Sequence, residues 1–233
     1  MQPRLVQARW FQVLVGLALL VAAALAYKLH TRRLHQRQVE MQRLVDERTE
    51  ALRQANEELS RLSFSDALTG LPNRRRFDQQ LDLEWRRTAR QGAPLALILV
   101  DVDCFKAYND ALGHSEGDAC LRDVAEIIRS TAGRAGDFAA RFGGEEFVLL
   151  IPGLDLTAAC LYAERLRAAC EARALPHPAS AVGPVITISL GVAAWVPRSG
   201  LDAAVLFDAA DAALYRAKAG GRNRVDSANP PEA

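Results

Sequence analysis

The sequence lacks closely paired cysteines and an excess of charge of one sign. Its four cysteines, Cys104, Cys120, Cys160 and Cys170, form no CxxC pair and no spacing typical of a zinc site. We therefore expect reduced thiols that act mostly as small buried hydrophobic side chains. A disulfide between Cys160 and Cys170 is the alternative. The formal net charge of +1 gives no reason to expect a nucleic-acid partner.

A long apolar run dominates the N-terminal part of the chain. Between Trp10 and Tyr27 the only polar side chain is Gln12. About twenty such residues in a helix cross a hydrocarbon core roughly 30 Å thick, and the two aromatic rings suit its interfaces. We therefore predict a single transmembrane helix at residues 10–29. A signal peptide cleaved near residues 24–26 is the alternative, which the length of the apolar run disfavours.

Basic residues flank this span unevenly. Arg4 and Arg9 lie in the short N-terminal flank at residues 1–9. The far side carries a larger basic group, which consists of Lys28, Arg32, Arg33 and Arg37. Because basic residues are retained on the cytoplasmic side of a membrane, this excess places the C-terminal part of the chain in the cytoplasm.

A seven-residue repeat follows the span. Hydrophobic residues fill two seam positions, with Arg48 and Gln38 as polar breaks; the seam residues are Leu34, Met41, Ala55 and Leu62 at one position and Val45, Leu52 and Leu59 at the other. This pattern predicts a parallel coiled coil at residues 30–62 that joins two chains in a homodimer. A solvated single helix is the alternative, but its apolar seam would then face water.

The remainder of the chain alternates between helical and strand patterns, which predicts an α/β (α+β) sandwich of ferredoxin-like or palm type. Gly143 and Gly144 suit the positive φ angles of a tight hairpin. Ser115 is the expected cap of one helix, with Asp118 in its first turn. We predict helices at 73–91, 115–130, 155–172 and 202–219, strands at 94–102 and 184–195, a hairpin at 138–151, a loop at 173–183 and a disordered tail at 227–233.

Carboxylates follow two of the expected strands. Asp101 and Asp103 come directly after an apolar run, and Glu145 and Glu146 follow the Gly-Gly turn. If the hairpin pairs beside the first strand, Asp101 and Glu145 converge, and clustered carboxylates repel one another unless a cation compensates them. Hard oxygen ligands of this kind suit Mg²⁺ together with phosphate oxygens. A solvated acidic turn is the alternative for either pair taken alone.

Several ordered motifs in residues 63–226 resemble the GGDEF-domain diguanylate cyclases. The signature-like segment is RFGGEEF at residues 141–147. The other matching segments are DALTGLPNR at 66–74, DVDCFK at 101–106 with ND at 109–110, GH at 113–114 and GD at 117–118, and LYRAK at 214–218 with GRNR at 221–224. The resemblance implies a palm-type nucleotide cyclase domain that condenses two GTP into cyclic di-GMP and releases two pyrophosphates, at the cytoplasmic side of a bacterial inner membrane.

The resemblance also implies roles for individual residues. Asp101, Glu145 and the backbone carbonyl of Val102 would bind Mg²⁺, or Mn²⁺ in its place, and Glu145 would also be the catalytic base for the 3′-hydroxyl of GTP. The hairpin glycines Gly143 and Gly144 would carry Glu145. The remaining implied substrate contacts are Asn109 and Asp118 with guanine, Lys106, Lys218 and Arg222 with phosphates, and His114 with the substrate.

A second set of residues matches a regulatory motif of the same family. Arg134 and Asp137 form an RxxD sequence whose spacing before Gly143 matches the product-binding site of these cyclases. Arginine stacks on guanine and binds phosphate, and a carboxylate accepts the guanine donors. The resemblance therefore implies feedback inhibition by cyclic di-GMP, with Arg165 as a further contact.

Three other functions compete with this interpretation. A catalytically silent domain could bind cyclic di-GMP or GTP, but the expected carboxylates, glycines and Lys218 are all present. A cyclase for another nucleotide would make no use of the guanine donors that Asp118 is expected to accept. A membrane tether or oligomerisation module accounts only for residues 1–62. Incubation with GTP and Mg²⁺ separates these functions.

Overall fold

A computed structural model describes residues 64–134, 136–197 and 202–229, together with isolated helical positions between 11 and 49. The chain divides into two units, Met1–Leu62 and Ser63–Ala233. The predicted flank at 1–9, part of the predicted span and most of the predicted coiled coil lie outside the described residues. Among the residues that are described, no helix is both long enough and apolar enough to cross a membrane.

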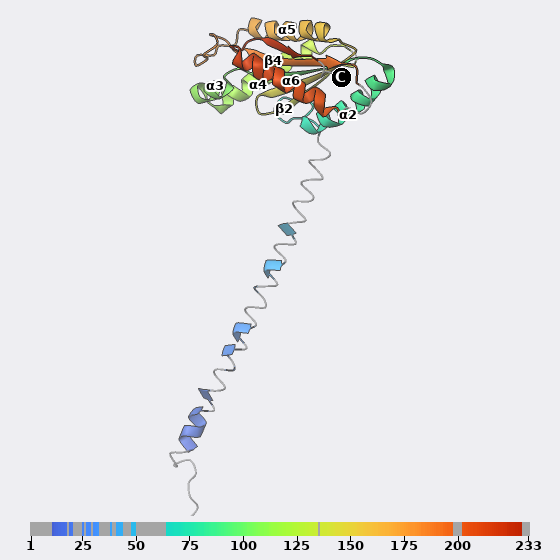
Figure 1. Ribbon diagram of the computed structural model, residues 1–233. Helices are drawn as coiled ribbons and strands as arrows, with labels where there is room; N and C mark the ends of the chain where they lie inside the picture. Colours follow the sequence, from blue (N-terminus) through green and yellow to red (C-terminus); the bar gives the residue numbers. More distant parts are fainter. Residues whose placement is uncertain are drawn as a thin grey trace, which may run out of the picture. The chain divides into compact units, whose positions relative to one another are not determined.

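The second unit contains a mixed sheet of five strands in the order β2-β3-β1-β4-β5 (Figure 1). Neighbouring strands are antiparallel except for β4 and β5, which are parallel. The strands are β1 (Leu95–Val102), β2 (Phe138–Gly143), β3 (Glu146–Pro152), β4 (Ile188–Trp195) and β5 (Val225–Ala228). All residues of β1 and β4 are buried, because helices cover both faces of the sheet.

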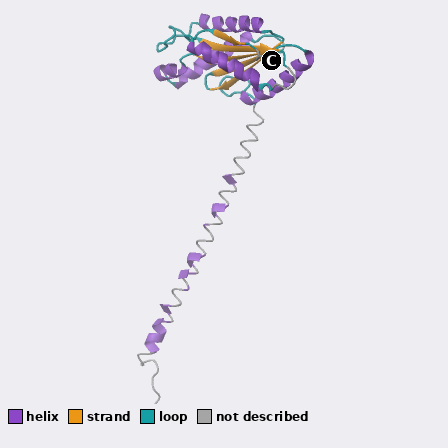
Figure 2. Cartoon of the chain, viewed as in Figure 1, coloured by secondary structure: helices purple, strands orange, loops and turns teal. Residues whose placement is uncertain are grey.

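Five helices cover the two faces of this sheet (Figures 1 and 2). They are α2 (Arg74–Gln91), α3 (Phe105–Leu112), α4 (His114–Thr131), α5 (Leu156–Ala172) and α6 (Ala204–Ala219). The core beneath α3, α4 and α5 includes Ile98 and Val100 of β1. The core beneath α2 and α6 includes Leu97 and Leu99. Alternate residues of one strand thus supply both cores, as the period of a β-strand requires.

Helix α6 lies unusually close to strand β4. A Cβ atom placed on Gly191 of β4 would lie 2.1 Å from the carbonyl oxygen of Ala210 and 2.3 Å from the amide nitrogen of Leu214, both in α6. Only glycine permits this approach, because any side chain would meet the helix backbone. The position of α6 on the sheet therefore depends on the absence of a side chain at residue 191.

The predicted α+β sandwich is confirmed, and so are the strand at 94–102, the hairpin at 138–151 and the helices at 73–91, 155–172 and 202–219, each within about two residues of its bounds. The prediction that Ser115 caps a helix is wrong. Helix α4 begins at His114 with Gly113 at its N-cap position, and Glu116 rather than Asp118 is the acidic residue of its first turn.

Two short elements were not predicted, helix α3 and strand β5. Helix α3 has only eight residues, of which Phe105 and Tyr108 are buried. The predicted disordered tail at 227–233 is wrong for residues 227 and 228, which belong to β5, while 230–233 lie outside the described residues. All four cysteines are free, in agreement with the expected reduced thiols.

Candidate active site

The β2–β3 hairpin brings its tip beside the end of strand β1. In the antiparallel register of β1 and β3, Asp101 lies opposite Glu146. The backbone N–H of Val102 donates to the carbonyl oxygen of Glu145 at 3.3 Å. The structure therefore brings together the segments that carry the predicted metal ligands Asp101, Val102 and Glu145. The sequence alone could not establish that β1 pairs with β3, because this pairing depends on the strand order.

The Asp101 carboxylate is buried next to other acidic groups. Its residue is 7% exposed. Burial raises the pKa of Asp101 to about 6, and the negative charges of Glu145 and Glu146 add to this effect. The ammonium group of Lys218, whose Nζ lies 2.7 Å from Asp101 Oδ2, opposes the shift. Ionisation of Asp101 at the end of β1 is therefore unfavourable, and a nearby cation stabilises the ionised form.

Arg141 fixes the conformation of the hairpin tip. Its Nε and Nη2 donate to the carbonyl oxygen of Gly144 at 2.9 and 2.7 Å, and its Nη1 donates to Asp66 Oδ1 at 3.1 Å. Gly144 has a φ of +51°, a conformation that favours glycine, whereas Gly143 has no positive φ. The roles of Arg141 and Asp66 were missed by the sequence analysis, although both lie within the matching motifs.

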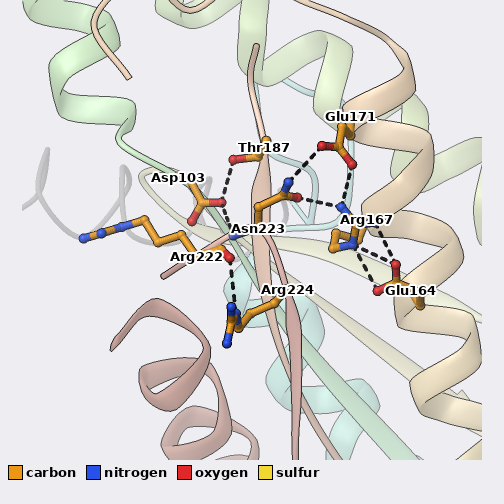
Figure 3. A network of polar contacts seen from close by, with 8 residues as sticks. All are labelled: Asp103, Glu164, Arg167, Glu171, Thr187, Arg222, Asn223 and Arg224. Atoms are coloured by element: carbon orange, nitrogen blue, oxygen red, sulfur yellow. Dashed lines mark hydrogen bonds and ion pairs between the residues drawn. The ribbon is translucent and has the colours of Figure 1, made fainter. Parts of the chain in front are cut away.

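Asp103, the second carboxylate of the pair that follows the apolar run, has different surroundings from Asp101. The residue is 1% exposed, and Thr187, Ser189 and Asn223 donate hydrogen bonds to its carboxylate; Figure 3 shows those from Thr187 and Asn223. Because these donors satisfy the Asp103 carboxylate, it needs no metal ion to compensate its charge. Within the described part of the chain, no group of three or more His, Cys, Asp or Glu side chains is arranged to hold a metal.

The predicted guanine-binding residues lie on α3 and α4. Asn109 packs so closely against α4 that a Cβ on Gly117 would lie 1.8 Å from its Oδ1 atom. This Oδ1 atom is buried and has no hydrogen-bond partner among the described residues. An unpaired buried acceptor is costly, so it suits a ligand that brings a donor. Asp118, the next residue of α4, is exposed.

The predicted phosphate-binding residues approach the site from different elements. Lys218 lies in the last turn of α6 and contacts Asp101, whereas Arg222 lies in the turn after α6 with its side chain exposed. Lys106 in the first turn of α3 and His114 at the start of α4 are both exposed. The structure thus brings Lys218 directly to the carboxylates, and it places Lys106 and His114 on the neighbouring helices without such a contact.

The three residues of the predicted regulatory site also lie together. Arg134 and Arg165 line one hollow of about 390 Å³, whose other walls are Leu154, Ala158 and Leu161. Asp137 Oδ2 accepts hydrogen bonds from the backbone N–H of Arg134 at 3.2 Å and from the Tyr162 hydroxyl at 3.4 Å. Two arginines that line one hollow, with a carboxylate bonded to the backbone of one of them, suit an anionic ligand that also offers donors.

The chain is similar to known proteins over most of its second unit. The family model described as "Diguanylate cyclase, GGDEF domain" matches residues 63–224. Diguanylate cyclase DgcP of Pseudomonas aeruginosa is 43% identical over 166 residues, which are 71% of this chain and 24% of that protein. Response regulator PleD of Caulobacter vibrioides is 38% identical over 177 residues, 76% of this chain and 38% of that protein. The chain thus spans well under half of these relatives' length.

Solved structures agree with this assignment. The coiled coil and GGDEF domain of DgcB from Caulobacter crescentus, in complex with c-di-GMP, matches with a TM-score of 0.65 and 36% identity, covering 80% of this chain and 97% of that one. The active GGEEF domain of a diguanylate cyclase from Vibrio cholerae matches with a TM-score of 0.59 and 31% identity, covering 68% of this chain and 98% of that one. The fold, the motifs and the extent of the match lead to one conclusion: the chain belongs to the GGDEF family of diguanylate cyclase domains.

Proposed function

We propose that the chain is a diguanylate cyclase that condenses two GTP molecules into cyclic di-GMP. The observation that carries this proposal is the buried Asp101 carboxylate beside the Glu145 hairpin tip, with Lys218 Nζ at 2.7 Å. In each of two steps a 3′-oxygen forms a bond to the α-phosphorus of the other GTP, and the bond from that phosphorus to pyrophosphate breaks. A silent receptor would need none of these groups and is not favoured.

The end of β1 suits a divalent cation, for which we propose Mg²⁺, with Mn²⁺ as a substitute. Asp101, Glu145 and the carbonyl oxygen of Val102 would hold it, since hard oxygen donors are the ligands that Mg²⁺ prefers. The raised pKa of Asp101, caused by burial, and its ion pair with a lysine ammonium group both support a cation site. A cation bound there supplies positive charge that polarises the α-phosphate and acidifies the attacking hydroxyl.

The protein's own residues orient GTP and move its proton. Glu145, at the hairpin tip, accepts the proton of the 3′-hydroxyl as that oxygen attacks. The unpaired Oδ1 of Asn109 and the carboxylate of Asp118 accept the N1–H and N2–H donors of guanine. Lys218 and Arg222 bind the phosphates, with Lys106 and His114 as further contacts from α3 and α4.

The reaction requires two copies of the domain. One domain offers one GTP site, and the product forms only when two bound nucleotides face each other. We propose that residues 30–62 form a parallel coiled coil that holds two chains together, and that residues 10–29 anchor them in a bacterial inner membrane with the cyclase domain in the cytoplasm. Association of free domains costs on the order of 4–15 kcal/mol of translational and rotational freedom, and a tether removes much of this cost.

Feedback inhibition is the proposed role of the hollow between Arg134 and Arg165. The two guanidinium groups can stack on guanine and bind the phosphates of cyclic di-GMP, and Asp137 can accept guanine donors. The hollow contains none of the proposed catalytic residues. Product can therefore bind there without occupying the position of GTP.

Asp101→Asn should change stability in a pH-dependent way. The folded-state pKa of Asp101, about 6, lies above its ordinary value of 3.8, so its ionisation makes the fold less stable as the pH rises through this window. Without divalent cations, we expect the free energy of unfolding of the variant to exceed the parent's by about 1–3 kcal/mol above pH 7, and the difference to shrink toward pH 4. Urea unfolding at several pH values measures this difference, and a pH-independent difference would contradict the assigned environment.

Glu145→Gln should abolish turnover while leaving the fold intact. Loss of the proton acceptor and of one metal ligand should lower the rate of pyrophosphate release from GTP by at least about 100-fold. Circular dichroism checks the fold. Glu126→Gln removes an exposed glutamate of α4 that pairs with Arg129, and it should leave the rate unchanged. An active Glu145→Gln enzyme would disprove the role of this residue.

Arg134→Ala should relieve inhibition by cyclic di-GMP without lowering the initial rate. Loss of one guanidinium group that binds the product should raise the inhibitory concentration by roughly tenfold or more, the equivalent of at least about 1.4 kcal/mol. Initial rates are measured against added cyclic di-GMP. Arg173→Ala, which breaks an exposed ion pair with Asp123, is the matched control. Superimposable inhibition curves for Arg134→Ala and its parent would rule out this site.

Removal of residues 1–62 should make the specific activity rise steeply with protein concentration and should move the protein out of the membrane fraction. Both effects follow from the loss of the proposed coiled coil and membrane anchor. Fusion of a strong parallel zipper in register should restore concentration-independent activity, whereas the same zipper joined two residues out of register should not. A truncated protein whose specific activity is constant well below micromolar concentration would refute the dimer proposal.

A further inference from the structure

The turn between α6 and β5 adopts a conformation that its sequence does not favour. Three consecutive residues have positive φ angles: Gly221 at +109°, Arg222 at +61° and Asn223 at +46°. Glycine adopts such angles freely and asparagine tolerates them better than most residues, but the left-handed conformation is strained for arginine. Contacts with the rest of the domain therefore hold this turn in place.

Asp103 holds this turn from the side of the sheet. Its Oδ2 accepts hydrogen bonds from the backbone N–H of Asn223 at 3.0 Å and from the Thr187 hydroxyl at 2.8 Å (Figure 3). Its Oδ1 accepts one from the Ser189 hydroxyl at 2.6 Å. Thr187 and Ser189 lie immediately before and within β4. A buried carboxylate with three donors fixes the backbone of the turn against the strand.

Helix α5 holds the side chain of Asn223 from the other side. Arg167 Nη1 donates to Asn223 Oδ1 at 2.7 Å, and Asn223 Nδ2 donates to Glu171 Oε1 at 2.9 Å. Arg167 also pairs with Glu164 and with Glu171, both at 2.7 Å. Its hydrogen bonds to Glu164, and then those to Glu171, raise the pKa of Arg167 above its usual value. The guanidinium group is only 15% exposed, so its position is well defined.

These contacts place the proposed phosphate-binding groups. Arg222 directly precedes Asn223, and in Figure 3 its side chain extends away from Asn223 and Arg167. Lys218, five positions before Asn223, is held by Asp101, two positions before Asp103. The end of β1 thus fixes both ends of the segment from Lys218 to Asn223. Arg222 lies within this segment, and α5 determines its direction through Asn223.

We propose that Asn223 and Arg167 form a positioning pair for the triphosphate of GTP. Neither residue contacts the substrate; together they hold the turn so that Arg222 faces the β- and γ-phosphates. This inference rests on the proposed function, because it assumes that the nucleotide site lies at the end of β1. It assigns a role to α5, which carries none of the proposed catalytic residues.

Asn223→Gly and Arg167→Ala test the pair in the full chain. Asn223→Gly keeps the positive φ and the backbone N–H that donates a hydrogen bond to Asp103. It removes only the side-chain contacts to α5. The probes are the α,β-methylene analogue of GTP, which cannot release pyrophosphate, and GMP, which lacks the β- and γ-phosphates. Calorimetry gives both dissociation constants, and steady-state kinetics gives KM and kcat. Arg173→Ala, at the end of the same helix, is the matched control.

The expected result is a selective loss of triphosphate binding. Both variants should bind the GTP analogue roughly tenfold more weakly and GMP within about twofold of the parent. KM should rise in the same proportion, with a smaller change in kcat. Arg167→Lys, which retains a donor for Asn223, should recover part of the loss, and Arg173→Ala should change none of these values.

Three outcomes would overturn the inference. An equal loss of affinity for the analogue and for GMP would show that the pair only stabilises the fold. Unchanged affinity for both would show that the pair plays no part in binding. A parent chain that binds neither nucleotide would refute the inference and the proposed function together. If the parent binds the analogue but makes no product, the proposed function fails while the affinities alone still test the positioning pair.

Discussion

The antiparallel pairing of β1 with both β3 and β4 is the constraint on which the candidate site depends. Because β1 is the central strand, its end meets the tip of the β2–β3 hairpin on one side and the start of β4 on the other. The first contact brings Asp101 next to the hairpin carboxylates, and the second supplies the hydroxyl donors of Asp103. A register shift of one residue would turn the Asp101 side chain to the opposite face of the sheet.

Asp101 and Asp103 show how surroundings separate two identical side chains. Both are buried at the end of the same strand. Asp103 receives hydrogen bonds from two hydroxyls and one backbone amide, and it therefore serves as an internal anchor. Burial raises the pKa of Asp101, its acidic neighbours add to this effect, and its single lysine partner opposes it. One carboxylate is satisfied by the fold, and the other is stabilised only by positive charge.

The sequence predicts those parts of the fold and the site that carry a local signal. The apolar run of β1 and the Gly-Gly turn each predict their elements, and the motifs predict the residues gathered around Asp101. The partners of Asp103 could not be predicted, since Asn223 lies 120 positions away and Ser189 lies 86 positions away. Strand β5 was missed because its four residues are never fully buried, so no hydrophobic run marks it.

The close approach of α6 to Gly191 has a mechanical consequence. Where the helix backbone rests directly on the strand backbone at Gly191, no side chain lies between them. Any side chain introduced at this position would force α6 away from the sheet, and Lys218 in the last turn of that helix would then lose its place beside Asp101.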